Sequence, residues 1–152
     1  MAHNKGTELV RDIMTTGVKT IAGTANLQEL AKLMSDHDIG AVPVVEVAGN
    51  GKVIGIVTDR DIVIRAVAQG KVPAEVEVSH VMSSRIFTVR EDDDLDKVFA
   101  LMSEKQVRRV PVVDAEDRIV GIIAQADVAT ESDESKKVAN VIESISEPAG
   151  NH

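Results

Sequence analysis

The chain repeats itself, and this internal repeat constrains the fold more than any other feature of the sequence. Residues 39–45 (IGAVPVV) match residues 107–113 (VRRVPVV) at an offset of 68 positions. Residues 55–62 match residues 121–128 at an offset of 66, so the second copy is shorter by two residues between these blocks. Several matches in the same order along a chain indicate a duplicated structural unit. The missing residues favour a hairpin loop at this point, where length is easily changed.

Each copy has the hydrophobic pattern of a strand, a helix, two further strands and a second helix. Helices are indicated by apolar residues at i, i+3, i+4 and i+7, and strands by short runs rich in valine and isoleucine. We expect Thr24 to cap the first helix of copy one, and the run Asp92-Asp93-Asp94 to lie at the positive end of the matching helix of copy two. The expected strands are 18–21, 42–47 and 53–57 in the first copy and 86–89, 110–114 and 119–123 in the second.

These patterns divide the chain into two repeats and a C-terminal helix. Val138, Val141, Ile142 and Ile145 have the spacing of an amphipathic helix, which could cover the domain or pack on a second chain. The expected boundaries are residues 8–70 for repeat 1, 71–77 for a linker, 78–130 for repeat 2, 131–146 for the C-terminal helix and 147–152 for a tail.

The composition argues against several classes of function. A net charge of −8 and only two aromatic residues, Phe87 and Phe99, disfavour a nucleic-acid binder. The absence of cysteine removes thiol catalysis and cysteine-ligated zinc. We expect no metal site, because the histidines are scattered and Asp36-His37-Asp38 fits a solvated helix end better than a ligand set. No apolar run could span a membrane and no secretory signal is recognisable, so the expected location is cytoplasmic.

The most informative residues stand where the third strand of copy one meets its second helix, at Thr58-Asp59-Arg60-Asp61. In one interpretation, Thr58 caps the helix and Asp61 completes an acidic variant of the capping box. In the other, a phosphate binds at the free N–H groups of the helix start and the Asp61 carboxylate accepts hydrogen bonds from a ribose diol. Both can hold together, because a capping side chain can lie beside a ligand.

With these residues the chain resembles a known family, the cystathionine-β-synthase (CBS) domain. The resemblance lies in the strand and helix order, the Val-Pro-Val-Val strand and the Gly-Ile-Val-Thr-x-x-Asp-Ile junction. Two ordered copies over residues 10–130 resemble a tandem pair, called a Bateman module, as in small stand-alone bacterial CBS-pair proteins of the hypoxic-response type. The resemblance implies an α/β fold of the α+β type, with two β-α-β-β-α repeats packed pseudo-symmetrically, sheet to sheet.

The resemblance also implies an adenosyl-ligand site in a cleft between the repeats. In that family one repeat gives the Thr/Ser-x-x-Asp junction for phosphate and ribose, and the other gives its first strand and the residues before its Val-Pro. The ligand-binding residues carried onto this chain are Thr58, Asp61, Ile86, Thr88, Arg108 and Arg109. Guanidinium groups suit a phosphate. For Arg108 and Arg109, a solvated strand edge or ion pairs with Asp114 or Glu116 stay open as an alternative.

The pseudo-symmetric cleft is expected to be degraded. It would combine Ala124 and Asp127 with residues 19–21 and with Gly40 and Ala41, and its candidate contacts are Asp127, Thr20 and Ala41. Ala124 has no hydroxyl group, and Gly40 and Ala41 carry no positive charge. We therefore expect one competent nucleotide site per chain, with the second cleft empty or taking an uncharged adenosyl group.

The sequence predicts a binding protein rather than an enzyme, because no nucleophile, metal cluster or acid–base pair can be placed. The expected function is a regulatory module that binds AMP, ADP, ATP or another adenosyl compound and needs no cofactor. Such a module would act as an energy or stress sensor towards a separate, unidentified protein, and the resemblance implies a homodimer. The alternative is a ligand-independent structural or stress-associated interaction protein whose cleft is unused.

Overall fold

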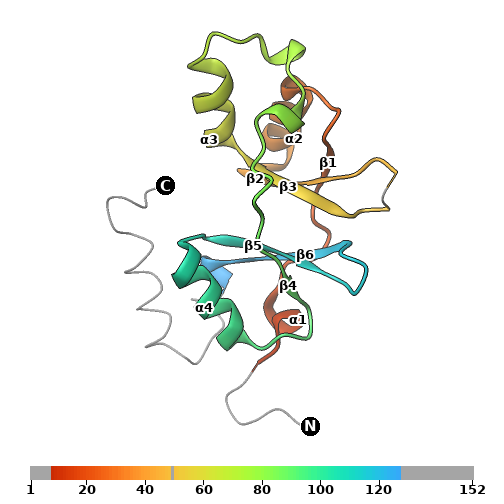
Figure 1. Cartoon of the computed structure of the whole chain (residues 1–152), viewed down its shortest axis with the longest axis vertical. Helices are drawn as coiled ribbons and strands as arrows, with labels where there is room; N and C mark the ends of the chain where they lie inside the picture. The colour runs from red at the N-terminus through yellow and green to blue at the C-terminus, as the bar shows by residue number, and fades with distance from the viewer. Residues whose placement is uncertain (1–7, 49, 128–152) are drawn as a thin grey trace. The chain divides into compact units, whose positions relative to one another are not determined.

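The computed structural model describes residues 8–48 and 50–127, and these residues form two three-stranded sheets with helices (Figure 1). Val18–Ile86 and Glu116–Ile119 make up one compact unit, which we call the first-repeat unit. Phe87–Ala115, with the described parts of Met1–Gly17 and Val120–His152, makes up the second-repeat unit. The predicted mixed α/β class is confirmed, whereas the predicted C-terminal helix (131–146) and tail (147–152) lie outside the described residues.

The first-repeat unit has the strand order β1-β2-β3, with β1 and β2 parallel and β2 and β3 antiparallel. Its core lies between the sheet and helix α2, and every second residue of β3 is buried, as expected of a strand with one face on a core. Its elements are β1 (Ile21–Ala22), α2 (Leu27–His37), β2 (Ala41–Val45), β3 (Val53–Thr58), α3 (Asp59–Ile62), the π-helical turn η1 (Val63–Val67) and the 3-10 turns η2 (Pro73–Glu75) and η3 (Val78–His80).

The second-repeat unit has the matching strand order β4-β5-β6, and β4 and β5 are parallel. Asp94 caps its long helix, since the Asp94 side chain accepts a hydrogen bond from the Lys97 N–H at 3.2 Å. The predicted position of the acidic run at a helix start is therefore confirmed. The described elements of this unit are α1 (Val10–Ile13), β4 (Val89–Arg90), α4 (Leu95–Lys105), β5 (Arg109–Val113) and β6 (Ile119–Ala124).

The structure corrects two local predictions. The first strand of each copy was expected at 18–21 and 86–89, but it starts about three residues later, because each pairs with its neighbour over only two residues. Thr24 does not cap α2. Asn26 does, since its side chain accepts the Glu29 N–H at 2.9 Å and the Glu29 carboxylate accepts the Asn26 N–H at 2.9 Å. This reciprocal pair satisfies two free N–H groups at once. Thr24 lies two residues before the cap position and so cannot take this role.

The chain segment that precedes each repeat completes the core of the other repeat. Val10 of α1 is fully buried in the second-repeat core, and Val78 and Val81 are fully buried in the first-repeat core. Backbone hydrogen bonds follow the same pattern, because Thr15 pairs with Ile122 and Ser83 pairs with Ile56 in both directions, at 2.9–3.0 Å. Each compact unit therefore contains a lead-in segment from outside its own sequence copy. The predicted boundaries of the two repeats follow the sequence copies and stay a prediction.

Two glycines at matching positions allow these lead-in segments to reach the sheets. A Cβ added at Gly55 would lie 2.6 Å from Met82 Sδ and 2.8 Å from the Ser83 carbonyl oxygen. A Cβ added at Gly121 would lie 2.7 Å from Met14 Sδ and 2.9 Å from a carbonyl oxygen of the preceding segment. Glycine inside a strand often marks such a close backbone approach, and here it recurs because both copies dock a segment in the same way.

Candidate functional site

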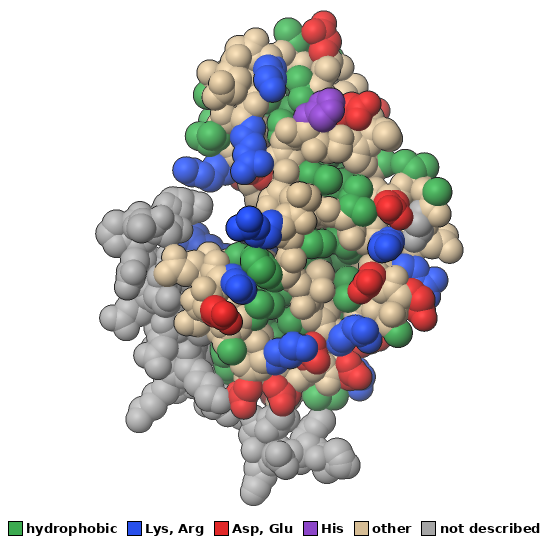
Figure 2. All heavy atoms as spheres, viewed as in Figure 1, with side chains coloured by type: hydrophobic (Ala, Val, Ile, Leu, Met, Phe, Trp, Pro, Cys, Tyr) green, Lys and Arg blue, Asp and Glu red, His purple; other side chains and the backbone are tan. Residues whose placement is uncertain are grey.

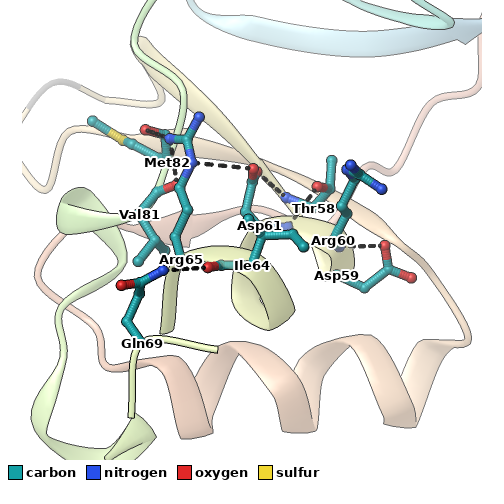
Figure 3. Close-up of polar contacts among 9 residues, drawn as sticks. All are labelled: Thr58, Asp59, Arg60, Asp61, Ile64, Arg65, Gln69, Val81 and Met82. Atoms are coloured by element: carbon teal, nitrogen blue, oxygen red, sulfur yellow. Dashed lines mark hydrogen bonds and ion pairs between the residues drawn. The ribbon is translucent and has the colours of Figure 1, made fainter. Parts of the chain in front are cut away.

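The junction of β3 and α3 carries two of the predicted site residues, Thr58 and Asp61 (Figure 3). Thr58 Oγ1 accepts a hydrogen bond from the Asp61 N–H at 3.2 Å, and Asp61 Oδ2 accepts one from the Thr58 N–H at 2.9 Å. This is the capping box predicted from the sequence, with aspartate in place of the usual glutamate. The capping interpretation is therefore confirmed, and the box fixes both side chains at the start of α3.

The Asp61 carboxylate has one oxygen bound by the backbone and one oxygen that faces Arg65. Oδ2 accepts the Thr58 N–H, whereas Oδ1 lies 3.9 Å from Nε of Arg65. The Asp61 side chain is 19% exposed, so it reaches the surface of the unit. An ionised carboxylate has about four acceptor sites on its two oxygens. Asp61 therefore has the capacity to accept further hydrogen bonds from a hydroxyl group.

Arg65 was not singled out from the sequence, yet it links this junction to a distant segment of the same unit (Figure 3). Its Nη1 donates to the Val81 carbonyl oxygen at 3.2 Å and lies 3.5 Å from the Met82 carbonyl oxygen. The signal available in the sequence was the i, i+4 spacing of Asp61 and Arg65, which is typical of an ion pair on a helix. The carbonyl partners left no signal, because any residue type supplies them.

The second junction repeats the backbone geometry without the hydroxyl group. The Ala124 N–H donates to Asp127 Oδ2 at 3.1 Å, as Thr58 does to Asp61. The methyl side chain of Ala124 cannot accept a hydrogen bond from the Asp127 N–H, as Thr58 Oγ1 does from the Asp61 N–H. Within the described residues, the two junctions therefore share a backbone bond and differ in their side chains, and the predicted degraded cleft stays a prediction.

Arg108 and Arg109 precede and begin β5, and both side chains are exposed. The Arg108 carbonyl oxygen accepts the Gln125 N–H at 2.8 Å, which fixes the backbone of this segment beside the second junction. In the described part of the chain, neither guanidinium group makes a hydrogen bond or an ion pair, and Glu116 binds Arg118 at 3.1 Å. Neither of these arginines therefore pairs with Asp114 or Glu116 in the part of the chain that the structure describes, and both side chains are exposed.

The other predicted contacts are divided between the two units. Ala41 lies opposite Thr58 in the β2–β3 register, so these two residues are brought together. Thr20 and Ile86 belong to the same first-repeat unit and are half-buried. Thr88, Arg108, Arg109 and Asp127 belong to the second-repeat unit. The grouping of residues from different units into one cleft stays a prediction.

The rest of the described surface adds no further chemical centre. Basic and acidic side chains are interspersed over much of the face drawn in Figure 2. Among residues 8–48 and 50–127, no group of three His, Cys, Asp or Glu side chains is arranged to hold a metal ion. Asp36 pairs with Lys32 at 3.1 Å instead. None of the described helices has the length and apolar character needed to cross a membrane, and the predicted cytoplasmic location stays a prediction.

The family model described as CBS domain matches this chain twice, over residues 10–67 and over residues 78–134. The chain belongs to the CBS-domain family. The two matches coincide with the two copies found in the sequence, so the predicted tandem CBS pair is confirmed.

Similar proteins cover most of this CBS pair. The CBS domain-containing protein YhcV of Bacillus subtilis (strain 168) is 38% identical over 137 residues, which are 90% of this chain and 94% of YhcV. The crystal structure of Hypoxic Response Protein I with two coordinated zinc ions has a TM-score of 0.74 at 35% identity, and the match covers 82% of this chain and 98% of that chain. The predicted likeness to hypoxic-response-type proteins is thereby confirmed.

A third similar protein has bound ligands. The CBS domain pair of protein MJ0100, in complex with 5′-methylthioadenosine and S-adenosyl-L-methionine, has a TM-score of 0.71 at 33% identity. The match covers 81% of this chain and 94% of the MJ0100 chain. Both of those ligands contain an adenosyl group.

Proposed function

We propose that this CBS pair is a regulatory module that binds an adenine nucleotide or a related adenosyl compound. The observation that carries the proposal is the Asp61 carboxylate, which a capping box holds in place while its side chain stays partly exposed. A carboxylate in this state can accept two hydrogen bonds from the cis-diol of a ribose. The adenosyl ligands of the MJ0100 CBS pair support the same chemistry for this chain.

The proposed ligand carries phosphate, which favours AMP, ADP or ATP over an uncharged adenosyl compound. Arg108 and Arg109 support this choice, because both are exposed and, within the described residues, neither has an anionic partner. Guanidinium groups bind phosphate through paired, charge-assisted hydrogen bonds. A nucleotide that reports adenylate charge would make the module an energy or stress sensor.

We propose that one ligand contacts residues from both copies and that each chain has one competent site. The proposed contacts of this site are Thr58, Asp61, Ile86, Thr88, Arg108 and Arg109. The matching second set is Asp127, Thr20 and Ala41, and it has neither the hydroxyl group of Thr58 nor the positive charge of the two arginines. The second set therefore binds phosphate weakly in this proposal. It is left empty or takes an uncharged adenosyl group.

In this proposal the module binds and does not catalyse, and it acts on a separate protein as a homodimer. Ligand binding would change which surface the dimer offers to that protein. No nucleic acid or membrane is part of the proposal, since the net charge of −8 repels phosphate backbones and anionic lipids alike.

A ligand panel measured by thermal unfolding tests the proposal. A ligand present at 100 times its dissociation constant stabilises the folded state by about 2.7 kcal/mol, which raises the melting temperature by several degrees. We expect AMP, ADP or ATP to produce this shift in the wild type and not in Asp61→Ala. S-adenosylmethionine and NAD complete the panel. If all five compounds leave the melting temperature unmoved at millimolar concentration, the chain is a ligand-independent interaction protein.

A further inference from the structure

We infer that Arg65 is a positioning residue of the proposed adenosyl site, because it faces the Oδ1 oxygen of Asp61 and links it to the Val81–Met82 segment. The inference rests on the proposed function, since the orientation of Asp61 matters for binding only if Asp61 contacts a ribose. Arg65 itself touches no ligand in this account. It acts through the carboxylate.

Arg65 and Asp61 face each other across one turn of the helix. The distance of 3.9 Å from Nε to Oδ1 is longer than a hydrogen bond, so the guanidinium attracts this oxygen without occupying its lone pairs. The other oxygen, Oδ2, is already held by the Thr58 N–H at 2.9 Å. Because the Thr58 N–H holds Oδ2 and the Arg65 guanidinium attracts Oδ1, the Asp61 carboxylate keeps one orientation. Its Oδ1 therefore stays available to a hydroxyl group in a fixed direction.

The Nη1 end of the Arg65 guanidinium contacts the Val81–Met82 segment. Nη1 donates to the Val81 carbonyl oxygen at 3.2 Å, and Val81 is fully buried in the first-repeat core. The next residue, Met82, packs so closely on Gly55 of β3 that a side chain at Gly55 would collide with it. This acceptor segment is therefore closely packed on the core and on β3. The Arg65 side chain is 52% exposed, and its guanidinium lies between the Asp61 carboxylate and the Val81 carbonyl oxygen.

The helix has an irregular turn at Arg65. Arg65 lies in the middle of the π-helical turn Val63–Val67, in which the Ala68 N–H donates to the Val63 carbonyl oxygen at 2.8 Å. The Gln69 side chain also reaches back to the Ile64 carbonyl oxygen at 3.4 Å (Figure 3). Single π-helical turns inside helices are frequent at functional sites. Here the turn interrupts the helix at the residue that links it to the Val81–Met82 segment.

The two sequence copies differ at this position in the way the inference requires. Four residues after Asp61 the chain has Arg65, whereas four residues after Asp127 it has Glu131. Glu131 lies outside the described residues. A glutamate side chain has no guanidinium group and cannot replace an arginine. The positioning residue is thus present only in the copy that also has Thr58.

Calorimetric titration of the full chain with AMP tests the inference. Arg65→Met keeps an unbranched apolar stem and removes the guanidinium, and we expect it to weaken AMP binding about tenfold. Arg65→Lys keeps the charge but loses the planar donor group, so we expect partial recovery. The melting temperature without ligand should fall by no more than a few degrees, because exposed ion pairs contribute little to stability.

A ligand without the ribose hydroxyl groups separates positioning from a structural role. If Arg65 acts through the contact of Asp61 with the diol, 2′,3′-dideoxy-AMP should bind the wild type weakly and Arg65→Met equally weakly. Lys32→Met is the matched control, because Lys32 forms an i, i+4 pair with Asp36 at 3.1 Å in the same unit and far along the chain from the junction. We expect this control to leave AMP binding unchanged.

The outcomes distinguish this inference from the proposed function. If the wild type binds AMP and Arg65→Met binds it as tightly, the inference is overturned and the proposed function stands. If Arg65→Met weakens AMP and dideoxy-AMP by the same factor, Arg65 acts on the structure in general and the inference is also overturned. If the wild type binds neither compound, the proposed function for AMP fails and the inference fails with it.

Discussion

The two strand-to-helix junctions of this chain have the same backbone and different side chains. In both, the first N–H of the helix donates to the carbonyl oxygen of the residue before the central strand. The Asp59 N–H donates to the Gly40 carbonyl oxygen at 2.9 Å, and the Gln125 N–H donates to the Arg108 carbonyl oxygen at 2.8 Å. In both, an aspartate three residues into the turn accepts the N–H of the last strand residue. The two copies thus share the backbone hydrogen bonds and the aspartate that form the turn. They differ in the neighbouring side chains that a ligand would contact.

The differences fall on opposite copies. The first copy has the hydroxyl group of Thr58 at its junction and the uncharged Gly40 and Ala41 before its central strand. The second copy has Ala124 at its junction and Arg108 and Arg109 before its central strand. If one ligand contacts the junction of one copy and the pre-strand residues of the other, as in our proposal, all the polar groups serve one ligand. A duplicated unit can therefore keep the backbone of a junction while the side chains of its two copies differ.

Substitution of the two glycines that contact the lead-in segments should destabilise both copies strongly. We expect Gly55→Ala and Gly121→Ala each to lower the free energy of unfolding by about 2 kcal/mol, because the added Cβ collides with a methionine sulfur and a backbone oxygen. Urea denaturation measures both values. Gly23→Ala is the control, since its added Cβ meets no atom closer than 3.4 Å. A large loss at only one of the two matching glycines would mean that the copies dock their segments differently.

The arginines before β5 provide the second test, on ligand binding. We expect the double variant Arg108→Ala, Arg109→Ala to weaken AMP binding by about 10- to 100-fold, because it removes charge-assisted bonds to phosphate. Its melting temperature without ligand should stay unchanged, since both side chains are exposed. Arg90→Ala removes another exposed arginine of the same unit and serves as the control. Unchanged AMP affinity in the double variant would leave these arginines as a solvated strand edge.

Exchange of the residues at the two cap positions, Thr58 and Ala124, should change the free energy of unfolding only slightly. Thr58→Ala should lower the free energy of unfolding by about 1 kcal/mol, because it removes the hydroxyl oxygen that accepts the Asp61 N–H. Ala124→Thr should raise it by up to about 1 kcal/mol, since the backbone of the second junction already has the capping geometry. Chemical denaturation of both variants gives the two values. A destabilising Ala124→Thr would contradict the equivalence of the two junctions.

The repeat architecture and the capping box could be predicted from the sequence, because both depend on local patterns of residue type. The choice between Thr24 and Asn26 as the cap of α2 could not, since both are capping residues and only the position of Glu29 relative to the helix start decides between them. The sequence also gave no sign that Val10 belongs to the second-repeat core. That contact joins segments far apart in the chain, where local periodicity carries no information.

The candidate site shows the same division. Thr58 and Asp61 were predictable because a capping motif fixes their spacing. Arg65 escaped attention because two of its three partners are backbone carbonyl groups, which no residue type reveals. The exposed state of Arg108 and Arg109 also required the structure, since a sequence cannot tell a free guanidinium from one paired with a nearby carboxylate such as Glu116.

A titration of AMP into matched aspartate variants tests the central claim most directly. Asp61→Asn and Asp127→Asn each remove one charge and keep an oxygen that can accept the capping N–H bond, so both variants should fold. We predict one AMP per chain for the wild type and for Asp127→Asn with similar affinity, and a loss of at least tenfold for Asp61→Asn. Equal losses in the two variants, or none in Asp61→Asn, would contradict the claim that only the first junction holds the nucleotide.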